Sequence, residues 1–180
     1  MRDKMRMLKK LLLDVVETGE IVLASGKKSD FYIDARKVTL DSRASGIISE
    51  IFIQKMNELN VSVVSGLVIG ADPIVGAVVG KAGDFNSDIR GLLVRKEPKR
   101  HGRRRQIEGP DIERGREVLV VDDVATSGGS LIKAAEILRD AGFSVSYAMV
   151  VVDRQEGARQ ALSERGIELF SVFTKQDLMQ

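Results

Sequence analysis

Two adjacent carboxylates, Asp122 and Asp123, stand between an apolar run and a stretch of small and hydroxyl residues. The whole stretch, Val118 to Ser130, reads "VLVVDDVATSGGS". Carboxylates accept hydrogen bonds from a pair of sugar hydroxyls, at about 1.5–3 kcal/mol for each bond to a charged group. Glycine and hydroxyl residues at the start of a helix present free backbone N–H groups, which suit a phosphate. Together these features predict a site for a ribose 5-phosphate.

The same carboxylates suit a reaction at C1 of the ribose. Breaking the bond at C1 develops positive charge on the ring, and nearby carboxylates stabilise that charge more than they stabilise the neutral ground state. The leaving group is then expected to be an anion, and a basic run from residue 95 to residue 105 supplies charge for a pyrophosphate. Its cations are Arg95, Lys96, Lys99, Arg100, Arg103, Arg104 and Arg105. Pro98 and Gly102 predict a loop here, and its length indicates a flap that closes over the substrate.

A strand and a helix have to position the acidic pair. Val118 to Val121 are β-formers of the kind that a parallel sheet buries on both faces, so a strand is predicted there. Apolar residues at helical spacing begin at Leu131, and Gly142 stands where a C-terminal cap is expected. The residues from Asp122 to Ser130 are therefore predicted to form the loop that joins strand to helix.

The rest of the chain alternates in the same way. A helical stripe predicts a helix over 42–59, with Asp41 or Ser42 as its cap. Further strands are predicted at 63–68, 91–94, 146–152 and 167–173. Such alternation predicts an α/β fold with a parallel sheet between helices, in which ligands gather at the carboxyl edge of the strands. The strand ends that should meet there read "IGADP", "RKEPKRHGRRR", "DDVATSGGS" and "DRQEG".

One apolar segment, residues 61–83, resembles a membrane helix in composition. Asp72 and Pro73 fall near its middle, where an acid would be costly in lipid and proline would disrupt the helix. We predict a buried strand, a tight turn at 70–72 and a helix that starts near Pro73.

Residues 1–19 have only three consecutive leucines before Asp14, which predicts an amphipathic helix rather than a signal peptide.

Composition limits the classes of protein that could hold such a site. The 180 residues are 43% hydrophobic, enough for one well-formed core, so a single domain over 1–180 is expected. The absence of cysteine excludes a disulfide scaffold and cysteine-ligated metal sites, and it fits a reducing, cytoplasmic location. A lone histidine argues against a zinc enzyme. The net charge of +2 is too balanced to indicate nucleic acid by itself.

The segment "VLVVDDVATSGGS" resembles the phosphoribosyl pyrophosphate signature of the type I phosphoribosyltransferases. Four further blocks, "ASGKKSDFYIDARKVT", "GLVIGADPI", "RKEPKRHG" and "VVVDRQEG", are similar to the orotate phosphoribosyltransferases, in that order and over nearly the whole chain. The resemblance implies a type I phosphoribosyltransferase-like parallel sheet flanked by helices. It also implies a small N-terminal hood over about 1–40 and a core over about 41–180. The implied activity is a Mg²⁺-dependent transfer from phosphoribosyl pyrophosphate to orotate, which gives orotidine 5'-monophosphate and pyrophosphate in UMP biosynthesis.

The resemblance also implies roles for individual residues. Its catalytic residues correspond to Asp122, Asp123, Lys99 and His101. The residues that bind phosphoribosyl pyrophosphate correspond to Arg95, Lys96, Lys99, His101, Asp122, Asp123, Val124, Ala125, Thr126, Ser127, Gly128, Gly129 and Ser130. Those that bind orotate correspond to Tyr32, Thr126 and Arg154. Mg²⁺ is implied to be held through substrate oxygens, with no direct protein ligand. A homodimer in which the flap lysine covers the partner's site is implied as well, with no nucleic acid or membrane as partner.

The chain departs from the family pattern in two places, and two other functions remain open. Ala24 stands where many members carry a lysine that contacts substrate, and Lys27 or Lys28 could replace it. An aromatic pair that packs on the orotate ring is half kept, as Tyr32 followed by Ile33. One alternative function is a phosphoribosyltransferase for a purine or uracil base. The other is a regulator that senses phosphoribosyl pyrophosphate and binds nucleic acid through its basic loop, with a steep salt dependence.

Overall fold

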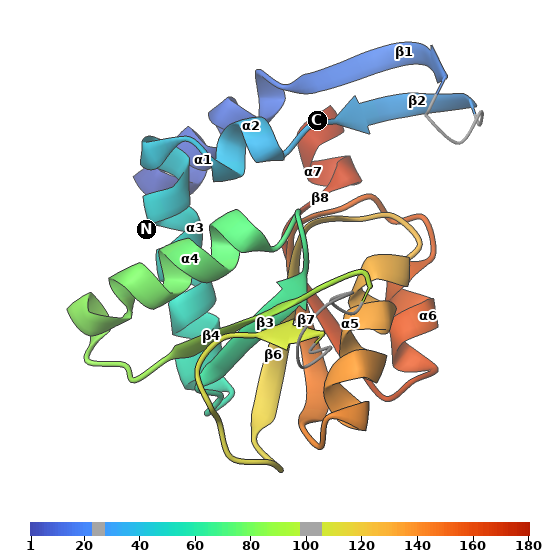
Figure 1. The fold of residues 1–180 in the computed structure, drawn as a ribbon. Helices are drawn as coiled ribbons and strands as arrows, with labels where there is room; N and C mark the ends of the chain where they lie inside the picture. The colour runs from blue at the N-terminus through green and yellow to red at the C-terminus, as the bar shows by residue number, and fades with distance from the viewer. Residues whose placement is uncertain (23–27, 98–105) are drawn as a thin grey trace.

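The centre of the molecule is a sheet of apolar strands that are buried on both faces. In the computed structural model, which describes residues 1–22, 28–97 and 106–180, six strands take the order β5-β4-β3-β6-β7-β8. All neighbours pair in parallel except β5, which runs antiparallel to β4 (Figure 1). The strands are β3 (Val63–Leu67), β4 (Arg90–Val94), β5 (Ile107–Glu108), β6 (Glu117–Ala125), β7 (Ser144–Asp153) and β8 (Glu168–Thr174). The expected α/β architecture is confirmed.

Helices cover both faces of this sheet. One face carries α3 (Ser42–Glu58) and α4 (Asp72–Lys81), followed by the short 3-10 helix η1 (Ala82–Phe85), and the other carries α5 (Gly129–Asp140) and α6 (Ala158–Ser163) (Figure 1). Side chains alternate along β6 between the two apolar cores. Leu119 and Val121 pack with the core on the α3 side, and Val118 and Val120 pack with the core on the α5 side. The sheet is thus held rigidly between two layers, as a site at its edge requires.

A smaller layer lies above the carboxyl edge of the sheet (Figure 1). It consists of α1 (Arg2–Leu13), the antiparallel strands β1 (Val16–Val22) and β2 (Lys28–Ile33), and α2 (Arg36–Thr39). We call these elements the hood. Leu8 and Phe31 of the hood are fully buried and belong to the same core as α3. The C-terminal helix α7 (Lys175–Met179) also holds the hood, because the Nζ of Lys175 lies 2.6 Å from the Oδ1 of Asp30.

The predicted elements agree with the structure to within two residues except at three boundaries. The N-terminal helix ends at Leu13 instead of extending over 1–19, because the β-branched residues that follow form β1. The loop predicted from Asp122 to Ser130 was wrong at both ends. Strand β6 continues to Ala125, since β7 keeps pairing with it as far as the Ala125–Asp153 pair, and α5 already begins at Gly129. The two carboxylates therefore stand on a hydrogen-bonded strand.

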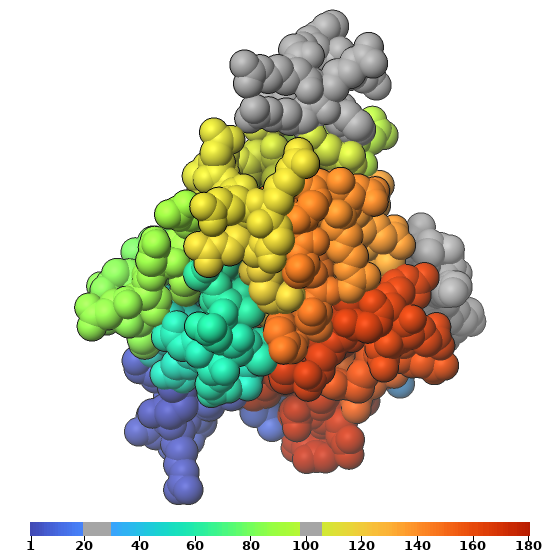
Figure 2. Space-filling model, turned by 90° about the horizontal axis from the view of Figure 1, so that it is seen from below, coloured from blue at the N-terminus to red at the C-terminus, as the bar shows by residue number. Residues whose placement is uncertain are grey.

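The amino edge of the sheet is closed by short connections. The N–H of Gly115 donates to the carbonyl of Gly142 at 2.7 Å, and the N–H of Ser144 donates to the carbonyl of Arg116 at 3.0 Å. Figure 2 looks at this side, where the yellow and orange segments that hold these residues lie against each other. Within the described ranges, no helix is both long and apolar enough to cross a membrane.

Candidate active site

The two carboxylates project from the carboxyl end of β6. Asp122 is buried, with 8% of its surface exposed, and its Oδ1 accepts a hydrogen bond of 2.9 Å from the N–H of Asp123. The Oδ1 of Asp123 accepts a bond of 2.8 Å from the N–H of Val124. These local bonds fix both side chains on the strand. Neighbouring carboxylates held in this way can receive a pair of hydroxyls on adjacent carbons of a sugar.

The end of β6 and the start of α5 form a cradle of about 210 Å³ beside the acidic pair. Gly128 adopts φ = +82°, and a Cβ at this position would come within 3.3 Å of the Ala158 backbone. Glycine is therefore needed to turn the chain into α5. The N–H groups of the first turn of a helix have no partner inside the helix, and the helix dipole adds positive potential there. The cradle suits a phosphate, and its lining residues are Asp122, Val124, Ala125, Thr126, Ser127, Gly128, Gly129, Ser130 and Leu131.

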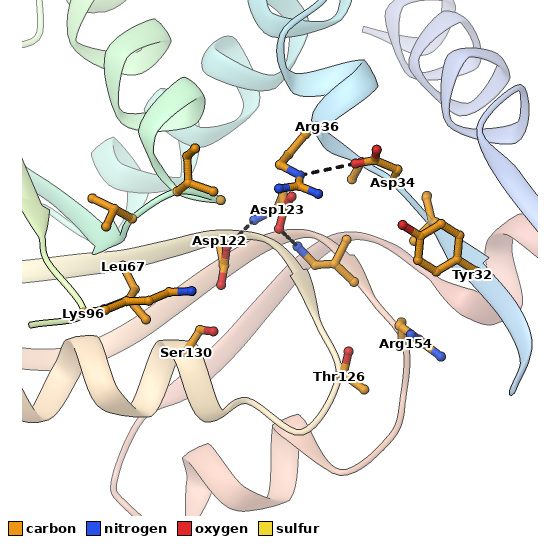
Figure 3. A pocket seen from close by; sticks show the side chains of 16 residues that line it. Tyr32, Asp34, Arg36, Leu67, Lys96, Asp122, Asp123, Thr126, Ser130 and Arg154 are labelled. Carbon is orange, nitrogen blue, oxygen red and sulfur yellow. Dashed lines mark hydrogen bonds and ion pairs between the residues drawn. The ribbon is translucent and has the colours of Figure 1, made fainter. Parts of the chain in front are cut away.

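A cavity of about 320 Å³ joins the acidic pair to the hood and to the loop after β3. In Figure 3, Lys96 lies at one end of this cavity, Tyr32 and Arg154 lie at the other, and the acidic pair lies between. The cavity thus has a basic end, an acidic middle and an end with an aromatic side chain and a guanidinium. Its lining residues are Tyr32, Ile33, Asp34, Ala35, Arg36, Leu67, Val68, Ile69, Gly70, Lys96, Asp122, Asp123, Val124, Thr126, Ser130 and Arg154.

The pKa of Asp122 is raised to about 7. Burial is the largest cause, because it disfavours the charged carboxylate, and the negative charge of Asp123 adds to it. Lys96 lowers the pKa and offsets part of this shift. Asp122 is therefore only partly ionised at neutral pH. A ligand that brings positive charge or hydroxyl donors would favour its ionised form.

This pKa shift makes the stability of the ligand-free protein depend on pH. Between about pH 4 and pH 7 the folded state holds a proton on Asp122 that the unfolded state releases, so stability falls as the pH rises through this range. Asp122→Asn removes the effect. We expect the variant to gain stability relative to wild type, by about 1–3 kcal/mol between about pH 5 and about pH 8. Denaturant unfolding at both pH values measures the difference, and a gap that does not widen with pH would contradict the assigned cause.

Most predicted site residues that the structure describes gather around these two cavities. Arg95 does not line either of them, and its guanidinium lies 3.6 Å from the carboxylate of Glu108, beside the basic end. The predictions for Lys99 and His101, and the question of Ala24 and Lys27, fall outside the described residues. Lys28 belongs to β2.

The sequence placed the loop after β3 at the ligand edge, but no residue of this loop or of the hood turn was predicted as a site residue. Arg36 is the main omission. Its Nε donates to the Oδ1 of Asp34 at 3.3 Å, a bond that Figure 3 marks, and Arg36 lines the same cavity as Asp123. The proximity of the "DAR" segment to Tyr32 was the available signal. Gly70 is the second omission, since a Cβ there would lie 2.3 Å from the Oδ1 of Asp122.

The donor atoms of the site suit a hard cation that is shared with a substrate. Among the described residues, no three acidic or histidine side chains gather in a way that could hold a metal ion. The acidic pair supplies carboxylate oxygens, the kind of ligand that Mg²⁺ prefers. Burial and the charge of Asp123 disfavour the ionised form of Asp122, so a nearby cation would stabilise it. Most ligands of such a cation would therefore have to come from a bound phosphate or sugar.

The sequence matches the phosphoribosyl transferase domain family over residues 46–166. It is 38% identical over 182 residues to the orotate phosphoribosyltransferase of Rhodopirellula baltica, covering 98% of this chain and 94% of the relative. It is 42% identical over 160 residues to the enzyme of the same name from Corynebacterium glutamicum, covering 89% of this chain and 85% of that one.

Solved structures give the same result for the fold. The orotate phosphoribosyltransferase of Mycobacterium tuberculosis in complex with 5-phospho-alpha-D-ribosyl 1-diphosphate is similar with a TM-score of 0.82 and 32% identity, over 98% of this chain and 99% of that chain. The adenine phosphoribosyltransferase of Leishmania donovani is similar with a TM-score of 0.69 and 13% identity, over 97% of this chain and 80% of that chain. The second likeness concerns the fold alone.

Proposed function

The chain belongs to the orotate phosphoribosyltransferase family, and from this premise we propose that it transfers the phosphoribosyl group of phosphoribosyl pyrophosphate to orotate. The products are orotidine 5'-monophosphate and pyrophosphate, so the protein is a pentosyltransferase of UMP biosynthesis. One observation carries the proposal: an acidic pair, of which Asp122 is buried, lies between a basic end, a phosphate cradle and an end that holds Tyr32 and Arg154. This order matches the order of groups in the reacting substrates.

In the proposed mechanism the ribose lies over the acidic pair. Asp122 and Asp123 accept hydrogen bonds from its hydroxyls, and the cradle at the start of α5 takes the 5-phosphate. As the bond at C1 breaks, positive charge develops on the ring, and the two carboxylates stabilise it. Because Asp122 is buried, this interaction is stronger than it would be in water.

The pyrophosphate leaves toward the basic end of the cavity. Lys96 lines this end and Arg95 lies beside it, so both can balance the charge of the leaving group. The family resemblance adds Lys99 and His101 from the flap. Mg²⁺, held mainly through the substrate beside Asp122 and Asp123, would supply positive charge that stabilises the negative charge developing on the leaving group. We place the activity in the cytoplasm, which fits a chain without cysteine.

Orotate lies at the hood end of the cavity. Its ring packs against Tyr32 near Thr126, and its carboxylate pairs with the guanidinium of Arg154, a geometry that suits the planar fork of arginine. A purine or uracil acceptor brings no carboxylate, so a buried cation at this end favours orotate over both.

Removing this cation should change the KM for orotate much more than the KM for phosphoribosyl pyrophosphate. We expect Arg154→Ala to raise the KM for orotate by at least about tenfold, and to change the KM for phosphoribosyl pyrophosphate by less than about threefold. Initial rates with one substrate varied at a time give both values. Equal losses for the two substrates would show that Arg154 does not bind the base.

We further propose that the protein is a homodimer in which the flap of one subunit completes the site of the other. Exposed apolar side chains at Leu40, Ile69 and Val79 support an interface near the cavity, because Ile69 also lines it. A partner that covers this surface would stand beside the basic end, where the flap begins.

Mixing two inactive variants tests the shared site. Lys99→Ala and Asp123→Asn should each be nearly inactive, and subunit exchange between them should restore roughly a quarter of wild-type activity, because half of the dimers then hold one intact site. Differential tags confirm the exchange. Activity no greater than the mean of the two parents would show that each flap serves its own subunit.

A further inference from the structure

Arg154 is buried, and its hydrogen-bond partners set the orientation of its guanidinium group. It follows the last residue of β7, and its N–H donates to the carbonyl of Ala125 at 2.9 Å, which fixes the backbone next to β6. Only 7% of its side chain is exposed. A guanidinium stays charged when buried, and the atoms that receive its hydrogen bonds decide where its plane points.

The guanidinium of Arg154 donates to two acceptors that lie in different layers of the molecule. The Oε1 of Glu156 lies 3.0 Å from the Nε of Arg154 and 2.7 Å from its Nη2. The backbone carbonyl of Phe31, in the hood, accepts from the same Nη2 at 3.0 Å. The Phe31 ring also lies beneath the guanidinium, with 5.8 Å from its central carbon to the ring centroid. The guanidinium is thus held between its own loop and the hood.

The backbone of the loop brings Glu156 back to Arg154. Gln155 adopts φ = +58°, a left-handed conformation that is uncommon outside glycine, and this turn reverses the chain between the two side chains. The N–H of Gln155 donates to the Oδ1 of Asp153 at 2.8 Å, and its Oε1 accepts from the N–H of Gln176 at 3.2 Å. The turn is therefore anchored to β7 and to α7, and Glu156 is preorganised before any ligand binds.

We propose that Glu156 is a positioning residue for the acceptor, which it serves by holding Arg154 in the orientation that pairs with a carboxylate. The inference rests on the proposed function, since it takes orotate as the partner of Arg154. Glu156 does not touch the reacting atoms in this account. Its contribution is to remove rotamer freedom from the guanidinium before orotate arrives, so that less entropy is lost on binding.

The sign of the effect separates this role from a purely electrostatic one. The negative charge of Glu156 by itself repels the carboxylate of orotate, so a residue that acted only through its charge would weaken binding, and its removal would lower the KM for orotate. A positioning residue has the opposite effect, because its removal leaves Arg154 poorly oriented and raises that KM.

The experiment compares Glu156→Ala, Glu156→Gln and a matched control in the full-length protein. The control is Glu136→Ala, which removes another acid paired with an arginine, Arg165, at 4.0 Å on an exposed surface away from the cavity. We expect Glu156→Ala to raise the KM for orotate by about fivefold or more, and to leave kcat and the KM for phosphoribosyl pyrophosphate within about twofold. Glu156→Gln keeps an oxygen for the guanidinium and should recover a large part of the loss. The control should match wild type.

A lowered or unchanged KM for orotate in Glu156→Ala would overturn the proposal, as would equal increases in KM for both substrates. Thermal unfolding of each variant shows whether a loss of folded protein contributes. A lowered Tm accompanied by increases in both KM values would assign Glu156 a structural role instead. Comparison with Arg154→Ala shows whether the positioning role alone is wrong or the proposed function is wrong as well. If Arg154→Ala raises the KM for orotate and Glu156→Ala does not, only the positioning role is lost. If neither variant raises the KM for orotate, then orotate does not bind beside Arg154 and that part of the proposed function is also wrong.

Discussion

Asp122→Asn and Asp123→Asn are each expected to lower the turnover number by at least about tenfold, which is about 1.4 kcal/mol of barrier. The carboxylates stabilise charge that exists on the ribose only while the bond at C1 is breaking, so their loss acts on kcat. Asparagine has nearly the shape of aspartate, and the β6–β7 ladder that carries both positions does not depend on their charge. The variants should therefore remain folded.

Steady-state kinetics with both substrates saturating measures this loss. Asp88→Asn is a suitable control, because Asp88 is an exposed acid beside Arg90, next to a different cavity. Full activity in both site variants would remove the acidic pair from the reaction. A fall in kcat for Asp88→Asn of the same size would point to a general effect on the fold.

Gly70→Ala is expected to lower kcat/KM by about 100-fold, because a displacement of about 1 Å in a catalytic group can cost that much. The added Cβ would lie 2.3 Å from the Oδ1 of Asp122 and 3.0 Å from the Oδ1 of Asp123. These atoms are the ends of side chains, so they can move aside with little disturbance of the backbone. The variant should keep most of its stability while both carboxylates are displaced.

Gly66→Ala provides the contrast that isolates this effect. Its Cβ would lie 2.2 Å from the carbonyl oxygen of Val121, so the backbone of β6 itself would have to move. We expect a loss of stability of about 1–3 kcal/mol, as is typical of an overpacked core. Urea unfolding and kinetics on both variants give the comparison. A destabilisation of Gly70→Ala as large as that of Gly66→Ala would mean that its inactivity follows from misfolding and not from displaced carboxylates.

The sequence was sufficient to predict the sheet and the position of the acidic pair. The β-formers before Asp122 and the helical spacing after Ser130 are strong local signals, and the edge at which they meet follows from the rules for parallel sheets. The exact end of β6 could not be predicted in this way. Aspartate and alanine favour strands weakly, and it is the pairing with β7 that keeps residues 122–125 extended.

The hood and its part in the site were harder to predict, for physical reasons. Strands β1 and β2 stabilise each other by pairing, and Phe31 is buried only because the core on the α3 side lies beneath it. Arg36 looks like an ordinary surface arginine near a short helix, and its place in the lining of the cavity depends on how the hood sits over the sheet. Similarly, the contact between Arg154 and the Phe31 carbonyl joins residues 123 positions apart, which local patterns do not record.

Identifying the reaction products shows whether the protein transfers the phosphoribosyl group to orotate. Purified protein is incubated with phosphoribosyl pyrophosphate, Mg²⁺ and one base at a time from orotate, uracil, adenine, guanine and hypoxanthine, and the nucleotides are separated by chromatography. We expect orotidine 5'-monophosphate and pyrophosphate in equal amounts from orotate, with no comparable product from the other bases. A nucleotide formed from uracil or a purine while orotate remains unreacted would contradict this expectation.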